Sequence, residues 1–369
     1  MKIEEAIASE PEVPPGLVYV SDGGPGFLRR RQGKGFSYRT TAGELASPAE
    51  RARIEALAIP PAWEDVWICA DPNGHLQATG VDAAGRRQYR YHADWSAWRA
   101  QRKYDGLAGF GLALPRFRRR VLRDLGRDPG ERELSLAAIA TLLDRLHLRV
   151  GSAAHTARNR TFGATTLLHR HLRLGDGEIV LRFRAKGGRM TEHRLQDTRL
   201  HRIFEAIDDL PGRNLFTWVD ADGLVHPIGS EAVNAYLAAA TGLAGVSAKT
   251  FRTWAGTLAA FTAARQTTGR LGIRVLAEAA AARLHNTPAI SRSAYIHPTV
   301  LGLVEMPPEA RTAYLAAVPA AGPRQLRADE RRLLGLLSTP PTAEASAERA
   351  STARVRARRE LPTEPSPIS

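Results

Sequence analysis

The sequence predicts an α+β fold, with a small β-rich domain at residues 1–95 and a larger, mainly helical domain at residues 96–322. Three observations support this division. Short apolar runs broken by Gly, Pro and Asp occupy residues 17–91, apolar residues recur at helical spacing from Ala93 onward, and one later stretch alternates like a hairpin. A chain of 369 residues is also long enough for two domains of ordinary size.

The first part of the chain contains strand-like runs that are each flanked by turn residues. Examples are residues 17–20 before Ser21-Asp22-Gly23-Gly24, residues 66–69 before Asp71-Pro72-Asn73-Gly74, and residues 88–91 after Ala84-Gly85. β-branched and aromatic residues between such turns are typical of short strands. Cys69, the single cysteine, has apolar neighbours and is expected to be buried.

The second part changes to a helical period. Residues 134–148 and 250–265 place apolar side chains at helical spacing, and Ser247 precedes the second segment as its expected N-cap. Between these segments, residues 178–183 and 191–195 alternate like two strands around Ala185-Lys186-Gly187-Gly188-Arg189. This pattern predicts a β-hairpin with Lys186 at its turn.

Beyond residue 323 the composition shifts to Arg, Ala, Glu, Pro and Ser, with few large apolar side chains. A segment of this kind buries too little apolar surface to offset the entropy that ordering would cost. We expect residues 323–369 to form a mobile basic tail, in which residues 333–337 are the one candidate helix.

The charge of the chain favours a polyanionic partner. It has 52 Lys and Arg against 38 Asp and Glu, a formal net charge of +14. The sequence contains no apolar run that approaches the length of a membrane-spanning helix, and the acidic N-terminus lacks the order of a secretory signal. We expect a cytoplasmic protein that binds a polyanion and does not associate with membranes.

Several cofactor and metal signatures are missing from the sequence. Gly33-Lys34 is followed by Gly35, so there is no GxxxxGK[ST] phosphate-binding loop. Asp220-Ala221-Asp222-Gly223 lacks a downstream carboxylate at calcium-loop spacing, and one cysteine cannot build a cysteine-based metal cluster. We therefore expect no nucleotide, no metal and no other cofactor.

A small set of basic and polar residues stands in unusual local contexts. Arg149 follows the predicted helix 134–148, Lys186 lies at the hairpin turn, and Arg252 lies near a predicted helix start, where an anion can bind. Residues 284–296 add Asn286 and Tyr295. Taken singly, each arginine is more often a surface or ion-paired residue, and Tyr295 is more often a half-buried tyrosine. The set as a whole weakens that interpretation.

At these residues the sequence resembles the type IB DNA topoisomerases, and through them the tyrosine recombinases, which share a catalytic domain. The resemblance extends over residues 17–320 and is most specific in the N-terminal motifs, which resemble the short, poxvirus-like bacterial branch. The motifs are Ile59-Pro60-Pro61-Ala62-Trp63, Gln77-Ala78-Thr79-Gly80, Gly85-Arg86-Arg87-Gln88-Tyr89-Arg90-Tyr91-His92, Leu148-Arg149-Val150-Gly151, Arg184-Ala185-Lys186-Gly187, Lys249-Thr250-Phe251-Arg252 and Asn286-Thr287-Pro288 with Ser293-Ala294-Tyr295.

The sequence departs from this family at one position. Many members carry histidine nine residues before the nucleophilic tyrosine, whereas this chain has Asn286 there and His285 one place earlier. Counting back from Tyr295 keeps Asn286 in register, and an amide can donate to a phosphate oxygen as a histidine does. We assign the role to Asn286, with His285 as the alternative.

The resemblance implies a reaction and a role for each residue. Tyr295 is the expected nucleophile, which forms a 3′-phosphotyrosyl link in one strand. Arg149, Arg252 and Asn286 are expected to stabilise the charge on the non-bridging oxygens, and Lys186 to protonate the leaving 5′ oxygen. The link retains the energy of the broken bond, so relaxation of supercoiled DNA by cleavage and religation needs neither ATP nor metal.

The resemblance also implies DNA contacts outside the catalytic residues. The protein is expected to be a monomer that binds double-stranded DNA and acts at the nucleoid. Its two domains are expected to clamp the duplex. The runs Arg29-Arg30-Arg31 and Arg118-Arg119-Arg120 are expected to be either phosphate-facing or solvated. The predicted DNA-binding residues are Arg86, Arg87, Gln88, Tyr89, Tyr91 and Lys249.

Two other functions stay open. A tyrosine recombinase would use the same five catalytic positions, but recombinases usually have histidine three residues before the second arginine, where this chain has Lys249. A non-enzymatic basic DNA-binding protein would explain the charge alone. Simple phosphate binding would not require the whole catalytic set in order.

Overall fold

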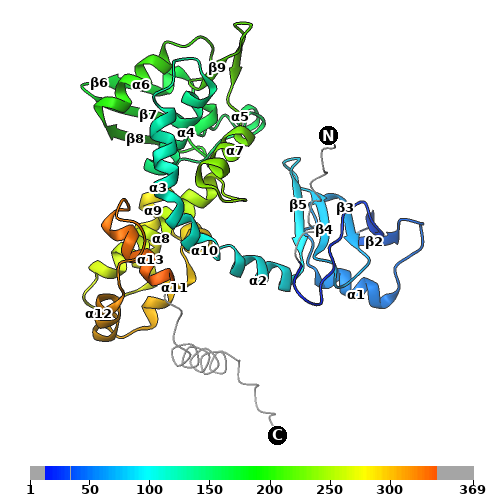
Figure 1. Ribbon diagram of the computed structural model, residues 1–369. Helices are drawn as coiled ribbons and strands as arrows, with labels where there is room; N and C mark the ends of the chain where they lie inside the picture. Colours follow the sequence, from blue (N-terminus) through cyan, green and yellow to red (C-terminus); the bar gives the residue numbers. More distant parts are fainter. Residues whose placement is uncertain (1–12, 34, 339–369) are drawn as a thin grey trace, which may run out of the picture. The chain divides into compact units, whose positions relative to one another are not determined.

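The computed structural model describes residues 13–33 and 35–338, and the chain divides into two compact units, Met1–Asp105 and Gly106–Ser369 (Figure 1). Unit 1 is built on a sheet and unit 2 mainly on helices. This arrangement confirms the predicted α+β class. Within the described ranges, no helix is both long and apolar enough to cross a membrane.

Unit 1 is organised around an antiparallel sheet with strand order β2-β1-β3-β4-β5. Among the described strands, β5 therefore lies at one edge of the sheet. The strands are β1 (Gly26–Gln32), β2 (Gly35–Thr40), β3 (Glu64–Cys69), β4 (Leu76–Val81) and β5 (Arg87–Tyr91).

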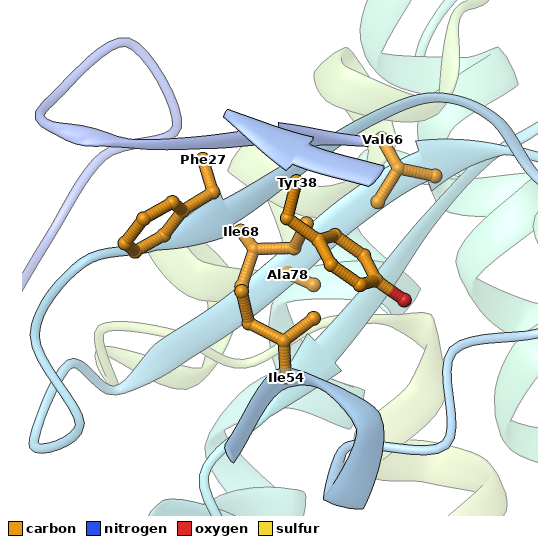
Figure 2. Close-up of a cluster of buried hydrophobic side chains, with 6 residues drawn as sticks. All are labelled: Phe27, Tyr38, Ile54, Val66, Ile68 and Ala78. Atoms are coloured by element: carbon orange, nitrogen blue, oxygen red, sulfur yellow. The ribbon is translucent and has the colours of Figure 1, made fainter. Parts of the chain in front are cut away.

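The helix α1 (Pro48–Ala56) packs on the sheet and adds Ile54 to the core of unit 1. Ser47 caps it, since the Ser47 hydroxyl accepts from the Glu50 N–H and the Glu50 carboxylate accepts from the Ser47 N–H. Figure 2 shows Ile54 pointing from α1 toward Ile68 and Ala78 of the sheet, and all three are buried. Cys69 is 2% exposed, as predicted.

The boundary of unit 1 falls later than the predicted residue 95. The helix α2 (Ala93–Arg102) belongs to unit 1 because Trp95 packs its ring 4.7 Å from the ring of His75, which precedes β4. Trp95 is 7% exposed. An aromatic contact across sequence positions, rather than a change of period, therefore sets where the unit ends.

Unit 2 is arranged around α8 (Ala248–Gln266), a helix that is buried along most of its length. Its Phe251 ring lies 4.8 Å from Phe110 and 4.9 Å from Phe117, so α3 packs directly against it. The other helices of unit 2 are α3 (Leu107–Asp124), α4 (Arg132–Arg145), α5 (Ala153–Asn159), α6 (Thr198–Asp208), α7 (Ser230–Thr241), α9 (Ile273–Leu284), α10 (Pro288–Tyr295), α11 (Pro298–Leu301), α12 (Pro308–Ala317) and α13 (Ala328–Ser338).

The predicted hairpin is present in unit 2. The strands β6 (Leu172–Gly175), β7 (Glu178–Arg184) and β8 (Met190–Gln196) form an antiparallel sheet in that order, and β7 and β8 enclose the turn that carries Lys186. Gly187 and Gly188 take positive φ values of 87° and 76°, which glycine adopts without strain. A separate small hairpin is formed by β9 (Thr217–Val219) and β10 (Val225–Pro227).

The segment predicted as a tail from residue 323 contains the helix α13, which includes the candidate helix at residues 333–337. The helix α13 packs on α3 and α8, and its Leu333 and Leu336 are fully buried. Glu330 is 1% exposed and binds Arg118 of α3 through paired hydrogen bonds of 2.7 and 2.9 Å. The candidate helix is thus present, but residues 328–338 are packed on unit 2 rather than mobile, because Glu330 has a partner far away in the sequence. Residues 339–369 of the predicted tail lie outside the described residues.

Candidate active site

Four of the predicted catalytic residues lie around one point in unit 2. Arg149 follows α4, Arg252 belongs to α8, Asn286 lies in the turn between α9 and α10, and Tyr295 is the last residue of α10. The helices α9 and α10 both pack on α8. The long central helix therefore gathers segments that are far apart in the sequence.

Arg252 holds the two loops of the site together. Its side chain is 4% exposed and donates to the carbonyl oxygen of His147, and at 3.0 Å to that of Leu284. These carbonyls follow α4 and end α9, where unpaired backbone oxygens carry partial negative charge. One guanidinium thus fixes the loop before Arg149 and the turn before Asn286.

Arg149 and Asn286 contact each other directly. The Arg149 guanidinium donates to the Asn286 Oδ1 atom, and the Asn286 backbone N–H donates to the Ala281 carbonyl at 3.0 Å. Because arginine has no acceptor, the amide oxygen of Asn286 must face Arg149. The amide nitrogen of Asn286 therefore points elsewhere, as a free donor.

Two buried donors of this site have no hydrogen-bond partner among the described residues. They are the Nδ2 atom of Asn286 and the Nε atom of Arg252. A buried donor without a partner costs about 1–3 kcal/mol, so folded proteins keep few of them. A phosphate oxygen accepts from such donors, which makes this point of unit 2 a candidate anion site.

Tyr295 lies half-buried beside these donors. The guanidinium carbon of Arg252 is 5.1 Å from the centre of the Tyr295 ring. Burial raises the pKa of Tyr295, but hydrogen bonding and charge from Arg252, and the charges of Arg149 and Lys249, outweigh it, so the pKa lies below its ordinary value. The phenol is therefore easier to ionise than a free tyrosine.

Two residues of α8 that the sequence did not single out fix the position of Tyr295. A Cβ atom on Gly256 would lie 2.7 Å from the Tyr295 carbonyl oxygen, so only glycine lets α10 approach α8 this closely. The Thr257 hydroxyl donates to the same carbonyl at 3.2 Å. Small residues facing another helix give no distinctive sequence signal, which is why they were missed.

The two lysines of the predicted site differ in their placement. Lys249 is exposed in the first turn of α8, and its charge lowers the pKa of Tyr295. Lys186 is exposed at the β7–β8 turn, and within the described part of the chain no hydrogen bond or ion pair links its ammonium group to another residue. The structure brings Lys249 near the tyrosine but does not tie Lys186 to the site.

The contacts of Asn286 and His285 differ as well. Asn286 contacts Arg149, whereas the His285 ring lies 4.4 Å from the His193 ring of β8. Desolvation, and then the charges of Arg252, Arg149 and Arg283, lower the pKa of His285. Of the two alternatives, the contact with the first arginine belongs to Asn286.

Comparison with known proteins agrees with the residues that this geometry brings together. The family model described as "Eukaryotic DNA topoisomerase I, catalytic core" matches residues 92–290, more than half of the chain. The chain belongs to the type IB DNA topoisomerases. The matched segment contains Arg149, Lys186, Arg252 and Asn286 and ends before Tyr295.

Two further matches agree with this assignment. The model "Bacterial DNA topoisomerase IB, N-terminal domain" matches residues 35–82, which supports the predicted bacterial branch. The chain is also similar to the DNA topoisomerase 1B of Acanthamoeba polyphaga mimivirus, with 26% identity over 299 residues that cover 77% of this chain and 89% of the relative. The predicted family and enzyme class, an isomerase, are confirmed.

In this topoisomerase, polar residues of β5 and Arg86, which precedes it, have partners in unit 1. The Asp82 carboxylate accepts from Arg86 at 2.8 Å and from Gln88 at 2.8 Å, and Arg87 forms an ion pair with Asp22. The predicted DNA-contacting side chains are therefore oriented by acids of unit 1. Their charge is partly neutralised at the surface.

The tyrosines of β5 form an exposed pair. Tyr89 and Tyr91 are 49% and 38% exposed, and their rings stack with centres 6.1 Å apart. They lie two residues apart on the edge strand, so both point to the same face of the sheet. This pair is a rigid aromatic surface beside the charged side chains.

The sequence missed a second group of arginines in the enzyme. A cavity of about 740 Å³ opens between α5, β7 and the segment that leads to β6. It shares Phe162 and Phe183 with a smaller pocket that Arg149 and Arg252 also line. Scattered single arginines show no run in the sequence, so only the fold brings them together. Those that line the cavity are Arg160, Arg170, Arg182, Arg184 and Arg213.

The two basic runs that were expected to face phosphate or solvent are partly structural. Arg29 donates to the backbone oxygens of Pro60 and Trp63, the latter at 2.5 Å. Arg118 pairs with Asp144 and with Glu330. Each run therefore contributes at least one arginine to internal bonding, because a long side chain can reach acceptors distant in sequence.

The part of the chain that the structure describes contains no group of metal ligands. Among the described residues, no three His, Cys, Asp or Glu side chains lie close enough together to hold a metal ion. The charges near Tyr295 are instead supplied by the arginines and by Lys249.

Proposed function

We propose that the enzyme relaxes supercoiled duplex DNA by cutting and resealing one strand, with Tyr295 as the nucleophile. Its phenolate attacks a phosphodiester and forms a 3′-phosphotyrosyl bond as the bond to the 5′ oxygen breaks. The freed 5′ hydroxyl later attacks the phosphotyrosine and restores both groups. Each step exchanges one phosphoester for another, so the proposed reaction requires neither ATP nor a metal ion.

In this proposal Arg149, Arg252 and Asn286 stabilise the transition state. Negative charge develops on the non-bridging oxygens of the five-coordinate phosphorus, and fixed donors there lower the barrier most. The two guanidiniums remain charged at any working pH, and the free amide nitrogen of Asn286 adds a neutral donor. The lowered pKa of Tyr295 supports its role as the attacking group.

Lys186 is the proposed general acid. A 5′ alkoxide is a poor leaving group unless it gains a proton, and an ammonium at a hairpin turn can reach it once DNA is bound. In religation the neutral amine would take the proton back. The exposed position of Lys186 is compatible with a residue that meets its partner only on the substrate.

We further propose that unit 1 contributes DNA contacts from β5, through Arg86, Arg87, Gln88, Tyr89 and Tyr91, and that Lys249 contacts DNA near the tyrosine. The proposal includes two units that clamp the duplex and a monomer that acts at the nucleoid. In this proposal one chain supplies every catalytic residue, namely Arg149, Lys186, Arg252, Asn286 and Tyr295.

The observation that carries the proposal is the convergence of donors on one tyrosine. Arg252 and Arg149 lie near Tyr295, and Asn286 contacts Arg149. Two buried N–H groups of this set, on Arg252 and Asn286, have no acceptor among the described residues. A surface for passive binding would not need buried, unpaired donors, because exposed lysines and arginines bind phosphate at less cost.

The test is relaxation of negatively supercoiled plasmid in EDTA without ATP, with Tyr295→Phe alongside. The wild type should relax the plasmid, and the variant should lose activity on the order of 10⁴-fold or more because the nucleophile is gone. Stopping the reaction with detergent should trap DNA on the wild-type protein through its 3′ end.

Tyr314→Phe is the matched control, because Tyr314 lies in α12, outside the site, and is also partly buried. It should relax plasmid at the wild-type rate. A wild type that shifts plasmid mobility without changing linking number would refute the proposal in favour of a passive DNA-binding protein. Exchange of strands between DNA molecules without relaxation would instead favour a recombinase.

A further inference from the structure

The two loops of the site share an uncommon backbone feature. His147 and His285, which lie shortly before Arg149 and Asn286, take φ values of 53° and 49°. This left-handed region favours glycine, and other residues persist there when their surroundings hold them. The contacts that hold His147 and His285 in this conformation therefore also help to fix the positions of Arg149 and Asn286.

The His285 ring is held against the hairpin of unit 2. It lies 4.4 Å from the ring of His193, which is 8% exposed on β8. The His193 ring in turn stacks on Phe183 of β7 at 5.9 Å and an interplanar angle of 18°. His193 thus lies between the hairpin and the turn that leads to Asn286.

The same hairpin carries Lys186. Ala185, which precedes the lysine, lines a small cavity of about 20 Å³ together with His193, Arg252 and His285. The ammonium group of Lys186 has no partner of its own among the described residues, so its reach is set by how the hairpin is fixed. The ring contact between His193 and His285 is one such fixing point.

The histidine also suits the charge of its surroundings. Burial, and then the proximity of His285 and Arg252, lower the pKa of His193 to about 4. The ring is therefore neutral at pH 7 and adds no positive charge beside Arg252. A lysine or arginine at this place would repel the guanidinium that holds the two loops together.

We infer that His193 is a positioning residue that docks the hairpin on His285 and so sets Lys186 at the leaving 5′ oxygen. The inference rests on the proposed function, because it gives His193 no contact with DNA and assigns its effect to Lys186. A displacement of about 1 Å in a reacting group can cost 10²-fold in rate. Loss of the ring should therefore slow cleavage strongly.

The test uses two substrates that differ in one atom. A duplex oligonucleotide with the ordinary bridging 5′ oxygen is compared with one that carries sulfur at that position. A thiolate leaves without a proton, since thiols ionise near pH 8.5 whereas alcohols do not. Single-turnover formation of the covalent adduct is measured on both substrates for the full-length wild type and its variants.

We expect His193→Ala to slow cleavage of the oxygen substrate about 10–100-fold and of the sulfur substrate at least tenfold less. His193→Phe, which keeps a flat ring between Phe183 and His285, should stay within about fivefold of the wild type on both substrates. His285→Gly should reproduce the His193→Ala pattern, and it keeps the test decisive if His193→Ala folds poorly, because glycine suits the backbone there.

Lys186→Ala distinguishes the role of His193 from the general-acid role of Lys186. If sulfur rescues Lys186→Ala but not His193→Ala, or if His193→Ala cleaves the oxygen substrate at the wild-type rate, the role of His193 is refuted and that of Lys186 stands. If sulfur does not rescue Lys186→Ala preferentially, the general-acid role fails and the inference fails with it. A wild type that forms no adduct at Tyr295 would refute the proposed function itself.

Discussion

Strand β5 of unit 1 and the tyrosine site of unit 2 treat their polar side chains in opposite ways. Gln88 of β5 and Arg86, the residue before the strand, share the carboxylate of Asp82, so these donors are satisfied before any ligand arrives. In unit 2, donors of Arg252 and Asn286 are buried and lack an acceptor among the described residues. Satisfied, exposed groups suit contacts that orient a ligand, whereas unsatisfied, buried groups suit charge stabilisation during a reaction.

Removal of Arg252 is expected to have the largest effect, and it tests whether the unpaired donors of unit 2 act in the reaction. We expect Arg252→Ala to slow covalent adduct formation on the order of 10³-fold, because it removes a charged donor and also releases the loops that carry Arg149 and Asn286. Arg252→Lys retains the charge but not the fork, and should lose on the order of 10²-fold. Single-turnover cleavage of a duplex oligonucleotide gives both rates.

Arg252→Ala leaves two backbone oxygens without their donor and can destabilise the fold. Circular dichroism spectra of both variants should therefore be recorded with the rates, to show that each protein is folded. The lysine variant serves as the folded comparison. If Arg252→Ala stays folded and cleaves within tenfold of the wild type, the buried donors do not stabilise the transition state, and the contrast between the two regions loses its functional meaning.

Asn286 gives a smaller and chemically sharper test. Asn286→Asp keeps the shape and the acceptor for Arg149 but replaces the free amide donor by an oxygen, so we expect a loss on the order of 10²-fold. Asn286→His restores a donor and should lie within about tenfold of the wild type. An aspartate variant that cleaves as fast as the wild type would contradict the assignment of the amide nitrogen as a donor.

Local patterns were enough to predict much of this molecule. Period and turn residues gave the α+β class, the helix that became α8 and the hairpin with Lys186 at its turn, because each depends on neighbours within a few residues. The motifs that resemble the family were also recognisable, because each is a short run of sequence. The match to residues 92–290 covers four of the five positions predicted to be catalytic.

Contacts between distant residues could not be read in the same way. Arg118 binds Glu330 across 212 positions, so α13 joined unit 2 although its composition predicted a mobile tail. Arg87 is paired with Asp22, and Arg252 with the carbonyls of His147 and Leu284. Such partners are chosen by the packed fold, and nothing in the local sequence identifies them.

Acid should weaken unit 2. Burial is the main reason why the pKa of His147 falls to about 3 and that of His193 to about 4, below their ordinary 6.5. The unfolded chain therefore binds these protons first, so their contribution to stability is complete above pH 6.5 and is lost as the pH falls toward 4. We expect urea unfolding, followed by the helical circular dichroism signal, to lose a few kcal/mol between pH 7.5 and pH 5.

His147→Phe should make that pH dependence shallower, whereas His155→Phe, at an exposed position of α5, should leave it unchanged. Equal pH dependence in wild type and His147→Phe would mean that the buried imidazole is not the origin of the acid sensitivity. In this comparison the two units would then differ only in their hydrogen-bond donors, which are paired at β5 and lack acceptors among the described residues at the tyrosine site.

The smallest effects are expected on β5. Hydrogen bonds from Arg86 keep the pKa of Asp82 well below its usual range, so the acid stays ionised and compensates the arginine at working pH. Arg86→Ala should therefore weaken non-covalent DNA binding by about threefold or less and leave the salt dependence almost unchanged, because few counterions are released at a compensated charge. Tyr89→Ala, which removes an exposed ring, should cost about three- to tenfold. Affinities measured with the Tyr295→Phe protein at several salt concentrations decide the matter. A tenfold loss and a shallower salt slope for Arg86→Ala would mean that DNA displaces Asp82, so that β5, like the tyrosine site, presents open donors to phosphate.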